Sequence, residues 1–598
     1  MSEASELHEC DLIMKGGVTS GVVYPYAITR IKERYRLRGI GGTSAGAIAA
    51  AIASAAEYRR QNGGGDIGFN QIDDIAEELS RNLEHMFQPS PELSKPFAIV
   101  QETFAKGVGL SIGVFLKTYK FETIKAALLG LIPAGFSAYH GAWGFVLFFL
   151  AAALAFIAFA IGAELRKVFS ERLPAADFGL CSGKTQPGHQ SGEPALTDWM
   201  FTKIQMIAGR DSSTPLTVGD LKASGITLAT MTTDLSTQRP YRLPLRDGEF
   251  FVCRSEMQRL FQDPLVEYLC ADQNKRQVLH QADPEDLYAL PGGDKFPVIL
   301  LARMSLSFPG LISAVPIWRE DVDAKLSSED AAPMTRLLFS DGGISSNFPV
   351  HFFDSPLPRR PTFGIKLTTF DERIHGKTNV YLPKTFEDIQ RLRTGSIKSI
   401  SDFLFAIFNT AKDWRDTLQS HLPGYAERIV EIRLESGTGG LNFNMDEQTI
   451  EELQDLGREA GDMLVSEFSS KDQLGFKNHR IRRALSILPS IEDMMTNIHD
   501  VYWQNSTDEK ESYRHLITDF ETDAFQGVSS EQRRTVIAPF LDGLAKTGYG
   551  ILKAEADGKG SVRDLNILRQ DASLRLTASA EEKSYDTQAP SAPVNKDV

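Results

Sequence analysis

Three short glycine-containing segments hold the residues whose types and spacing suit acyl transfer. Gly42-Thr43-Ser44-Ala45-Gly46 is a GxSxG pattern between an apolar run and an alanine-rich segment. At a turn from strand to helix, such glycines allow a strained backbone and expose the serine hydroxyl over a helix N-terminus, whose dipole favours developing negative charge. The pattern predicts Ser44 as a nucleophile, with Gly42 and Gly46 as motif glycines. The alternative is that the small residues only allow close packing of a helix on a sheet.

An acyl-transfer serine also needs backbone amides that stabilise the oxyanion. The segment Lys15-Gly16-Gly17-Val18-Thr19-Ser20-Gly21 lies between the first predicted strand and the first predicted helix. There its amides would face Ser44, so we expect Gly16 and Gly17 to form the oxyanion hole. A phosphate-binding interpretation is disfavoured because the GK[ST] ending of a P-loop is absent.

The third segment supplies a candidate base. Phe339-Ser340-Asp341-Gly342-Gly343 places a carboxylate at the end of an apolar run and before two glycines. A strand-end position would let Asp341 approach the serine directly, with Gly342 and Gly343 as the motif glycines. Taken alone, Asp-Gly-Gly is more often a simple turn than a catalytic motif.

Two other residues offer alternatives to Asp341. Asp234 in the segment TTDLS is a second strand-end carboxylate. His351 follows Asp341 by ten residues, which is a permissible chain order for a Ser-His-Asp enzyme of the α/β-hydrolase type. That fold needs several strands before its serine, whereas Ser44 follows only one or two. One short loop would also have to supply both partners, so we interpret His351 as a loop histidine.

Together these segments resemble the patatin-like phospholipases, over Asp11 to Tyr58 and again over about Pro215 to Thr369. Further matching segments are PLTVGDL, TTDLSTQRPYRLP, ARMSLSFPGL and SDGGISSNFPV. The resemblance implies a Ser-Asp dyad, with Ser44 as nucleophile, Asp341 as base, and Gly16 and Gly17 in the oxyanion loop. The chain departs from the family pattern at Ser20, where the family usually has Arg or Lys.

The elements around these residues predict an α/β fold. We expect a patatin-like three-layer sandwich with a mainly parallel central sheet, an apolar helical-hairpin insertion and a mostly helical C-terminal region. Predicted strands are Asp11–Met14, Arg38–Gly42, Gly225–Met231, Pro297–Leu301, Arg336–Phe339 and Arg428–Leu434, and predicted helices are Val22–Tyr35, Ala45–Tyr58, Asp446–Phe468 and most of Ile481–Lys553. The expected domains are 1–106 and 196–370 for the core, 107–195 for the insertion, 371–576 for a helical extension and 577–598 for a disordered tail. Residues 173–213 are interpreted as an exposed connector because they are rich in Gly, Pro and Ser.

The insertion contains an unusual apolar stretch. Residues 126–163 hold no Asp, Glu, Lys or Arg, and the part from Trp143 to Ala163 is long enough to cross a bilayer. Three basic residues flank it on each side, namely Lys117, Lys120, Lys125, Arg166, Lys167 and Arg172. This pattern predicts a membrane-inserted hairpin that divides at His140-Gly141 and keeps both ends on the cytoplasmic face. Its short first arm either crosses the membrane or is re-entrant. A buried core helix pair is the alternative.

Composition excludes several classes of protein. Asp and Glu (78) exceed Lys and Arg (64), which argues against a dedicated nucleic-acid binder. Four cysteines without CxxC or Cys/His spacing support neither a disulfide scaffold nor a zinc site, and no other metal or cofactor is implied. The acidic start MSEASELHEC predicts no cleaved signal peptide.

The sequence therefore predicts a membrane-associated serine lipid acyl hydrolase with its catalytic domain in the cytoplasm and membrane lipid as substrate. Its protein partners are left open. The competing hypothesis is a patatin-shaped membrane scaffold with little or no turnover, which recruits partners through its C-terminal helices. Ser20 and the unassigned C-terminal chain leave that hypothesis open.

Overall fold

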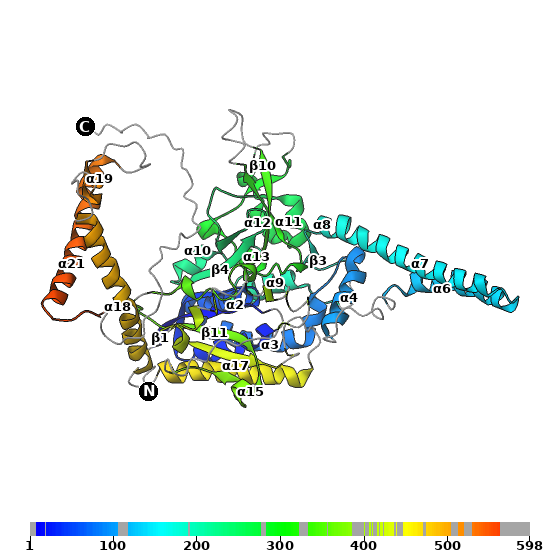
Figure 1. Ribbon diagram of the computed structural model, residues 1–598, viewed down its shortest axis with the longest axis horizontal. Helices are drawn as coiled ribbons and strands as arrows, with labels where there is room; N and C mark the ends of the chain where they lie inside the picture. Colours follow the sequence, from blue (N-terminus) through cyan, green and yellow to red (C-terminus); the bar gives the residue numbers. More distant parts are fainter. Residues whose placement is uncertain are drawn as a thin grey trace. The chain divides into compact units, whose positions relative to one another are not determined.

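The computed structural model describes most of the chain and is shown in Figure 1. The described residues are 7–17, 20–105, 118–188, 192–276, 283–321, 333–355, 357–384, single positions and short runs between 397 and 422, 424–435, 438, 446–469, 474–503, 512–519 and 529–562. They divide into two units, Met1–Arg480 and Ile481–Val598. Part of the predicted oxyanion loop, Val18 and Thr19, and the predicted tail from 577 lie outside the described residues.

A large mixed sheet forms the centre of the first unit. Its eleven strands within the described chain are, in spatial order, β12 (Val380–Tyr381), β13 (Ile429–Leu434), β11 (Thr362–Thr369), β1 (His8–Met14), β2 (Tyr35–Gly42), β4 (Thr227–Asp234), β10 (Met334–Asp341), β9 (Val315–Glu320), β6 (Phe251–Cys253) and β7 (Leu287–Ala289), with β5 (Arg239–Leu243) beside β4. The run from β13 to β4 is parallel. The strands beyond β4 pair antiparallel, so the α/β class is confirmed and the parallel strands occupy its centre.

Alternating side chains of β1 show how the two faces of the sheet are covered. Leu12 and Met14 belong to the main core beneath the helices. Ile13 points to the opposite face, where it packs with Phe348, Val350 and other residues of a smaller cluster. This alternation is the period of two that a strand buried on both faces requires.

Helices from distant parts of the chain pack around the parallel strands. The main ones are α1 (Val23–Ile31), α2 (Ala45–Arg59), α3 (Ile67–Met86), α9 (Leu196–Ala208), α13 (Val298–Ser305) and α17 (Glu447–Phe468). The predicted start of α17 is confirmed, because the Asp446 side chain accepts a hydrogen bond from the Thr449 amide (2.8 Å) and caps the helix. Gly457 of α17 lies against the Val23 carbonyl of α1, so helix and strand beyond residue 370 belong to the first unit.

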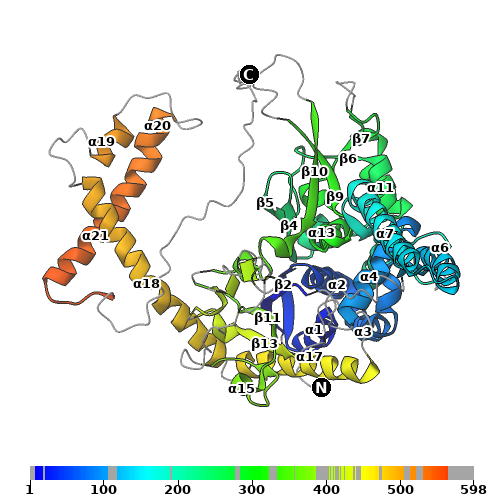
Figure 2. The same cartoon turned by 45° about the vertical axis from the view of Figure 1, so that its right-hand side comes forward.

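Shorter elements complete the first unit. They are α4 (Ser94–Ala105), α8 (Leu173–Ala175), α10 (Val218–Ala223), α11 (Arg254–Leu260), α12 (Asp263–Leu269), α15 (Glu372–His375) and a two-stranded sheet of β3 (Gly179–Cys181) and β8 (Gly310–Ile312). Figure 2 shows several of them from a second direction.

Two predictions about local structure are wrong. Pro297–Leu301, predicted as a strand, lies at the start of helix α13, which Pro297 precedes as the N-cap residue. The predicted connector at 173–213 contains α9, whose Trp199 is 1% exposed, together with the buried strand β3. Short apolar runs do not distinguish strand from helix, and the Gly and Pro residues that suggested a connector precede α9.

The apolar stretch forms two helices that lie side by side. These are α6 (Lys120–Tyr139) and α7 (Trp143–Lys167), joined at residues 140–142 close to the predicted division. Of the described helices, one stretch, Trp143–Ala175, is long and apolar enough to cross a membrane, and none of its apolar window is buried. The alternative of a buried core helix pair is therefore wrong for α7.

The second unit is helical in its described part. Its helices are α18 (Leu474–Trp503), of which the part from Ile481 onward belongs to this unit, α19 (Tyr513–Thr518), α20 (Ser530–Gln532) and α21 (Ala538–Ala556). Gly548 of α21 lies against the Met495 carbonyl of α18, and the buried His499 ring contacts the Ala545 carbonyl (3.1 Å). The helical character predicted for 481–553 is confirmed for these residues.

Candidate active site

Ser44 occupies a strained turn between β2 and α2. Its backbone has φ 55° and ψ −126°, a conformation that side chains other than glycine rarely adopt. The flanking glycines are sterically required: a Cβ at Gly46 would lie 2.3 Å from the Met14 carbonyl oxygen, and one at Gly42 would lie 2.5 Å from Gly46. This is the strand-turn-helix geometry predicted for a serine elbow, and it holds Ser44 at the N-terminus of α2.

The segment Ser305–Ser307, which begins at the last residue of α13, connects Ser44 with Asp341. The Ser44 amide donates a hydrogen bond to the Ser305 hydroxyl oxygen (3.2 Å). Two residues further on, the Ser307 carbonyl accepts hydrogen bonds from the Asp341 amide (2.9 Å) and from the Ser340 hydroxyl (2.8 Å). One short segment therefore holds the backbones of both candidate catalytic residues.

The register of the strands also brings Ser44 and Asp341 near each other. On one side of β4, Gly42 pairs with Thr230, two residues before Ser44. On its other side, Asp341 pairs with Thr232, two residues beyond Thr230. Ser44 and Asp341 therefore lie at about the same level along β4, on opposite sides of it. Both are buried, at 4% and 3% exposure.

A buried arginine on α13 fixes the segment between them. Arg303 is fully buried and donates hydrogen bonds to the Ser307 hydroxyl (2.6 Å), the Thr197 hydroxyl (3.1 Å), and the Ser182 and Ser313 carbonyls (2.9 Å each). Burial lowers the pKa of its guanidinium to about 9, against the opposing field of Asp177. Arg303 lies in the segment ARMSLSFPGL, but no local pattern indicates its role, because its acceptors are scattered along the chain.

The predicted oxyanion loop lies against the Ser44 turn, but one of the loop's amides is hydrogen-bonded to another part of the chain. A Cβ at Gly16 would lie 3.2 Å from the Ser44 Cβ, so this glycine allows the close approach. Its amide, however, donates to the Asn347 carbonyl (2.9 Å). The Gly16 amide can therefore stabilise the oxyanion only if it releases the Asn347 carbonyl and donates to the oxyanion instead. Gly17, the next residue of the loop, and Ala45, the residue after Ser44 in the first turn of α2, carry the other candidate amides.

Asp341 and its glycines form a tight turn against β4. The Gly343 amide donates to Asp341 Oδ1 (2.6 Å), and a Cβ at Gly342 would lie 2.1 Å from the Met231 carbonyl oxygen. A Cβ at Gly343 would approach both Asp341 Oδ1 and Asn347 Oδ1. The two glycines of this motif are therefore needed for close packing.

A buried carboxylate, Asp416, which the sequence did not indicate, holds the loop at Ser346–Phe348 that follows the Asp341 motif. Asp416 is buried and accepts hydrogen bonds from the Ser346 hydroxyl (3.0 Å to Oδ1) and the Phe348 amide (2.8 Å to Oδ2). The carbonyl of Ser346 in turn accepts from the Thr43 hydroxyl (3.1 Å). Asp416 therefore supports a loop that contacts the elbow through Thr43 and the oxyanion loop through Asn347.

The alternative bases occupy different surroundings. The Asp234 carboxylate accepts hydrogen bonds from the Ser236 amide (2.9 Å) and the Thr237 hydroxyl (2.6 Å), so it closes the turn after β4. His351 lies in a short 3-10 turn, with its ring edge-on to Phe352 at 5.0 Å between centroids. Ser20 begins the turn that leads into α1. Among the described residues, no group of three or more His, Cys, Asp or Glu could hold a metal ion.

Comparison with known proteins gives a full-length relative. The chain is 32% identical over 589 residues to a protein of Rhizobium meliloti (strain 1021) described as an RpoH suppressor, and the match covers 86% of this chain and 88% of that protein. The chain belongs to the family of this RpoH suppressor. The name of that relative specifies no reaction, so it leaves the chemistry of the family to be inferred from the site. No protein-family model matches the chain.

Two solved structures are also similar along most of the chain. VipD from Legionella pneumophila is 14% identical, with 94% of this chain and 90% of VipD covered and a TM-score of 0.29. The ExoU-SpcU complex from the type III secretion system of Pseudomonas aeruginosa is 14% identical, with 94% and 79% covered and a TM-score of 0.19. TM-scores this low do not establish a shared fold, so neither structure contributes to the interpretation of the site.

Proposed function

We propose that this protein is a serine lipid acyl hydrolase of the patatin-like type, with Ser44 as nucleophile and Asp341 as its base. The observation that carries the proposal is the left-handed backbone of Ser44 at the junction of β2 and α2. That strain persists only where surrounding structure enforces it, and it is the backbone conformation typical of a serine nucleophile on a strand-to-helix turn. The shared support of Ser44 and Asp341 by Ser305–Ser307 supports the pairing.

The reaction follows from these positions. Asp341 takes the proton of the Ser44 hydroxyl as Oγ bonds to the ester carbonyl carbon, and backbone amides hold the oxyanion. The ester C–O bond then breaks, and the alcohol leaves with the proton that Asp341 returns. Water attacks the acyl-enzyme, Asp341 again accepts and returns a proton, and fatty acid leaves as Ser44 is restored.

The second part of the proposal is that α6 and α7 insert into a membrane and keep the site next to its lipid substrate. Ser44 precedes these helices and Asp341 follows them, yet both must act in one compartment. The pair therefore crosses the membrane an even number of times or dips in and returns. Large apolar side chains of α7 support insertion, with Trp143, Leu147 and Phe159 at 68, 71 and 76% exposure.

Substitution of Ser44 tests the proposal directly. Ser44→Ala should lower the hydrolysis of a soluble short-chain ester by about a thousandfold or more, because no other group forms the acyl-enzyme. Ser54→Ala is the matched control: this buried serine of α2 bonds the Ala50 carbonyl (2.7 Å) one turn back, so its removal leaves the elbow intact. Wild-type rates in folded Ser44→Ala protein would contradict the nucleophile assignment. Absence of turnover in folded wild-type protein on esters and phospholipids would favour the scaffold hypothesis.

A further inference from the structure

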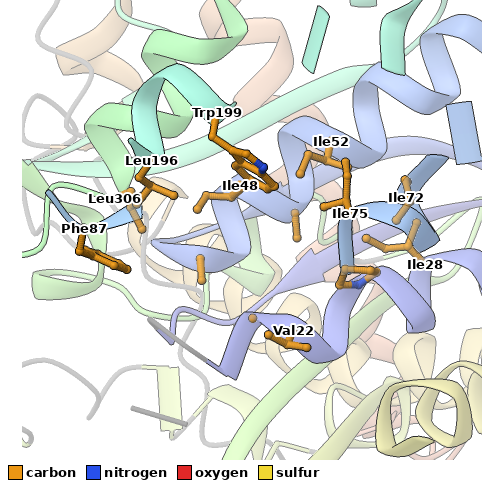
Figure 3. Close-up of a pocket in the computed structure, with 14 residues that line it drawn as sticks. Val22, Ile28, Ile48, Ile52, Ile72, Ile75, Phe87, Leu196, Trp199 and Leu306 are labelled. Carbon is orange, nitrogen blue, oxygen red and sulfur yellow. The ribbon is translucent and has the colours of Figure 1, made fainter. Parts of the chain in front are cut away.

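An apolar pocket begins beside the elbow and runs along α2. The open space in and in front of it, solvent at its mouth included, is about 640 Å³. Its fourteen lining residues are glycine, alanine, proline or larger apolar residues (Figure 3). The one polar side-chain atom among them, Trp199 Nε1, donates to Glu78 Oε1 (2.8 Å), which is not part of the lining. The pocket therefore offers water no side-chain partner and suits a hydrocarbon.

One end of the pocket lies next to the candidate nucleophile, although Ser44 is not itself a lining residue. Ala45, which lines it, follows Ser44 directly, and a Cβ at the lining residue Gly21 would lie 3.0 Å from the Ala45 Cβ. Leu306, also in the lining, follows Ser305, whose hydroxyl accepts the Ser44 amide. Because Ser44 is itself buried, a substrate that reaches its hydroxyl must use an internal space of this kind.

The other end is closed by four isoleucines from three helices. Figure 3 shows Ile28, Ile52, Ile72 and Ile75 gathered at the end away from Leu306. The four are between 0 and 4% exposed, so no opening to solvent is expected there. We refer to these residues as the isoleucine end.

We infer that this pocket binds the acyl chain of the ester cleaved at Ser44, and that the isoleucine end limits the length of chain it encloses. The statement that the bound chain belongs to an ester cleaved at Ser44 rests on the proposed function. The ligand is one unbranched hydrocarbon chain with a carbonyl carbon at Ser44 and its methyl end at the isoleucines.

The geometry of α2 sets the expected chain length. Its lining residues Ala45, Ile48, Ala49 and Ile52 share one helix face, and the first and last are seven helical steps apart, or about 10 Å along the axis. An extended chain advances roughly 1.2 Å per bond, by analogy with the peptide backbone, so about eight to ten carbons fit. Each enclosed methylene should raise kcat/KM about fourfold, until the pocket is full.

The test compares 4-nitrophenyl esters in the full-length protein, from acetate through octanoate and decanoate to hexadecanoate. The value of kcat/KM should climb to the octanoate or decanoate ester and then level off. Ile75→Phe should lower the decanoate value about tenfold and leave acetate and butyrate unchanged, because the ring occupies space that about two methylenes would fill. Ile67→Phe is the control, since Ile67 lies on the same helix α3 but is 51% exposed. Equal kcat/KM across the series, or equal losses in both variants, would overturn the inference.

A binding measurement separates failure of the pocket from failure of the proposed function. Calorimetry with decanoate on Ser44→Ala protein requires no turnover. Binding that strengthens from butyrate to decanoate and is weakened in the Ser44→Ala, Ile75→Phe double variant supports the pocket even if no ester is hydrolysed. Hydrolysis in the wild type with no decanoate binding would contradict the pocket and leave the Ser-Asp assignment standing. Ile75→Ala, expected to extend the plateau to longer esters, provides a second variant if Ile75→Phe does not fold.

Discussion

Helices α2 and α7 are both almost free of charge, yet they have opposite surroundings. In α2, twelve of the fifteen residues are buried, and its small side chains allow Gly46 to approach the Met14 carbonyl. In α7, by contrast, large apolar side chains such as Leu147 and Phe159 are more than two thirds exposed. Apolar composition alone therefore does not indicate what a helix packs against.

Side-chain size explains the difference between the two helices. Alanine and glycine let a helix lie close to a sheet, so α2 fits the dense packing of a protein interior. Large exposed side chains leave an apolar surface that a soluble protein rarely presents. The protein chain supplies the apolar surroundings of α2, and a bilayer would supply those of α7.

The largest expected effect is on membrane binding. Deleting residues 126–163 and joining the ends with a short Gly/Ser linker should move the protein from the membrane fraction to the soluble fraction almost completely. The deletion removes the only described helix that is long and apolar enough to span a bilayer, while hydrolysis of soluble esters should persist. Sedimentation and a short-chain ester assay measure both effects. Full-length protein that stays soluble at low and high salt without detergent would contradict membrane insertion of α7.

The next effect concerns the elbow end of α2. Asp341→Asn should lower kcat on a short-chain ester by about a hundredfold to ten-thousandfold, because an amide does not accept the serine proton. The Asn oxygen can still accept the Gly343 amide, so the turn should remain. Asp234→Asn, at the alternative base, should have little effect on kcat, since Asp234 serves the turn after β4. A larger loss in Asp234→Asn than in Asp341→Asn would reverse the assignment.

A smaller effect is expected from the loop beside the elbow. The Asp416 carboxylate accepts hydrogen bonds from two donors, the Ser346 hydroxyl and the Phe348 amide. Asp416→Asn replaces one of the two accepting oxygens with an NH2 group, which does not accept. We expect kcat to fall about tenfold with KM nearly unchanged, together with a loss of about 1–3 kcal/mol in unfolding free energy. Asp446→Asn is the control, because Asn caps a helix as well as Asp does. An unchanged kcat in folded Asp416→Asn protein would leave Asp416 with a purely structural role.

Local sequence patterns predicted the Ser44 turn, but not the buried residues Asp416 and Arg303 that hold the segments around it. The GxSxG segment, its preceding strand and its alanine-rich helix are short-range features, and the structure has β2, Ser44 and α2 in that order. Asp416 and Arg303 act through partners far along the chain, so no local spacing identifies them. The pocket was not predicted because its lining comes from α1, α2, α3, α9 and nearby loops.

The errors also have physical causes. Pro297–Leu301 is a short apolar run that suits strand or helix equally, and the helix α13 forms because its apolar residues are all buried. Beyond residue 370, the chain still contributes to the first unit, where β13 pairs with β11 and α17 packs on α1. Such pairings depend on tertiary contacts rather than on local composition.

The most direct test of the central claim is labelling with a fluorophosphonate probe, which reacts with an activated serine. We expect one labelled residue, Ser44, in full-length protein, and loss of labelling in Asp341→Asn but not in Asp234→Asn. Mass spectrometry of the labelled peptide that holds the segment Gly42–Gly46 identifies the site. No labelling of folded wild-type protein, or labelling at a serine other than Ser44, would contradict the account.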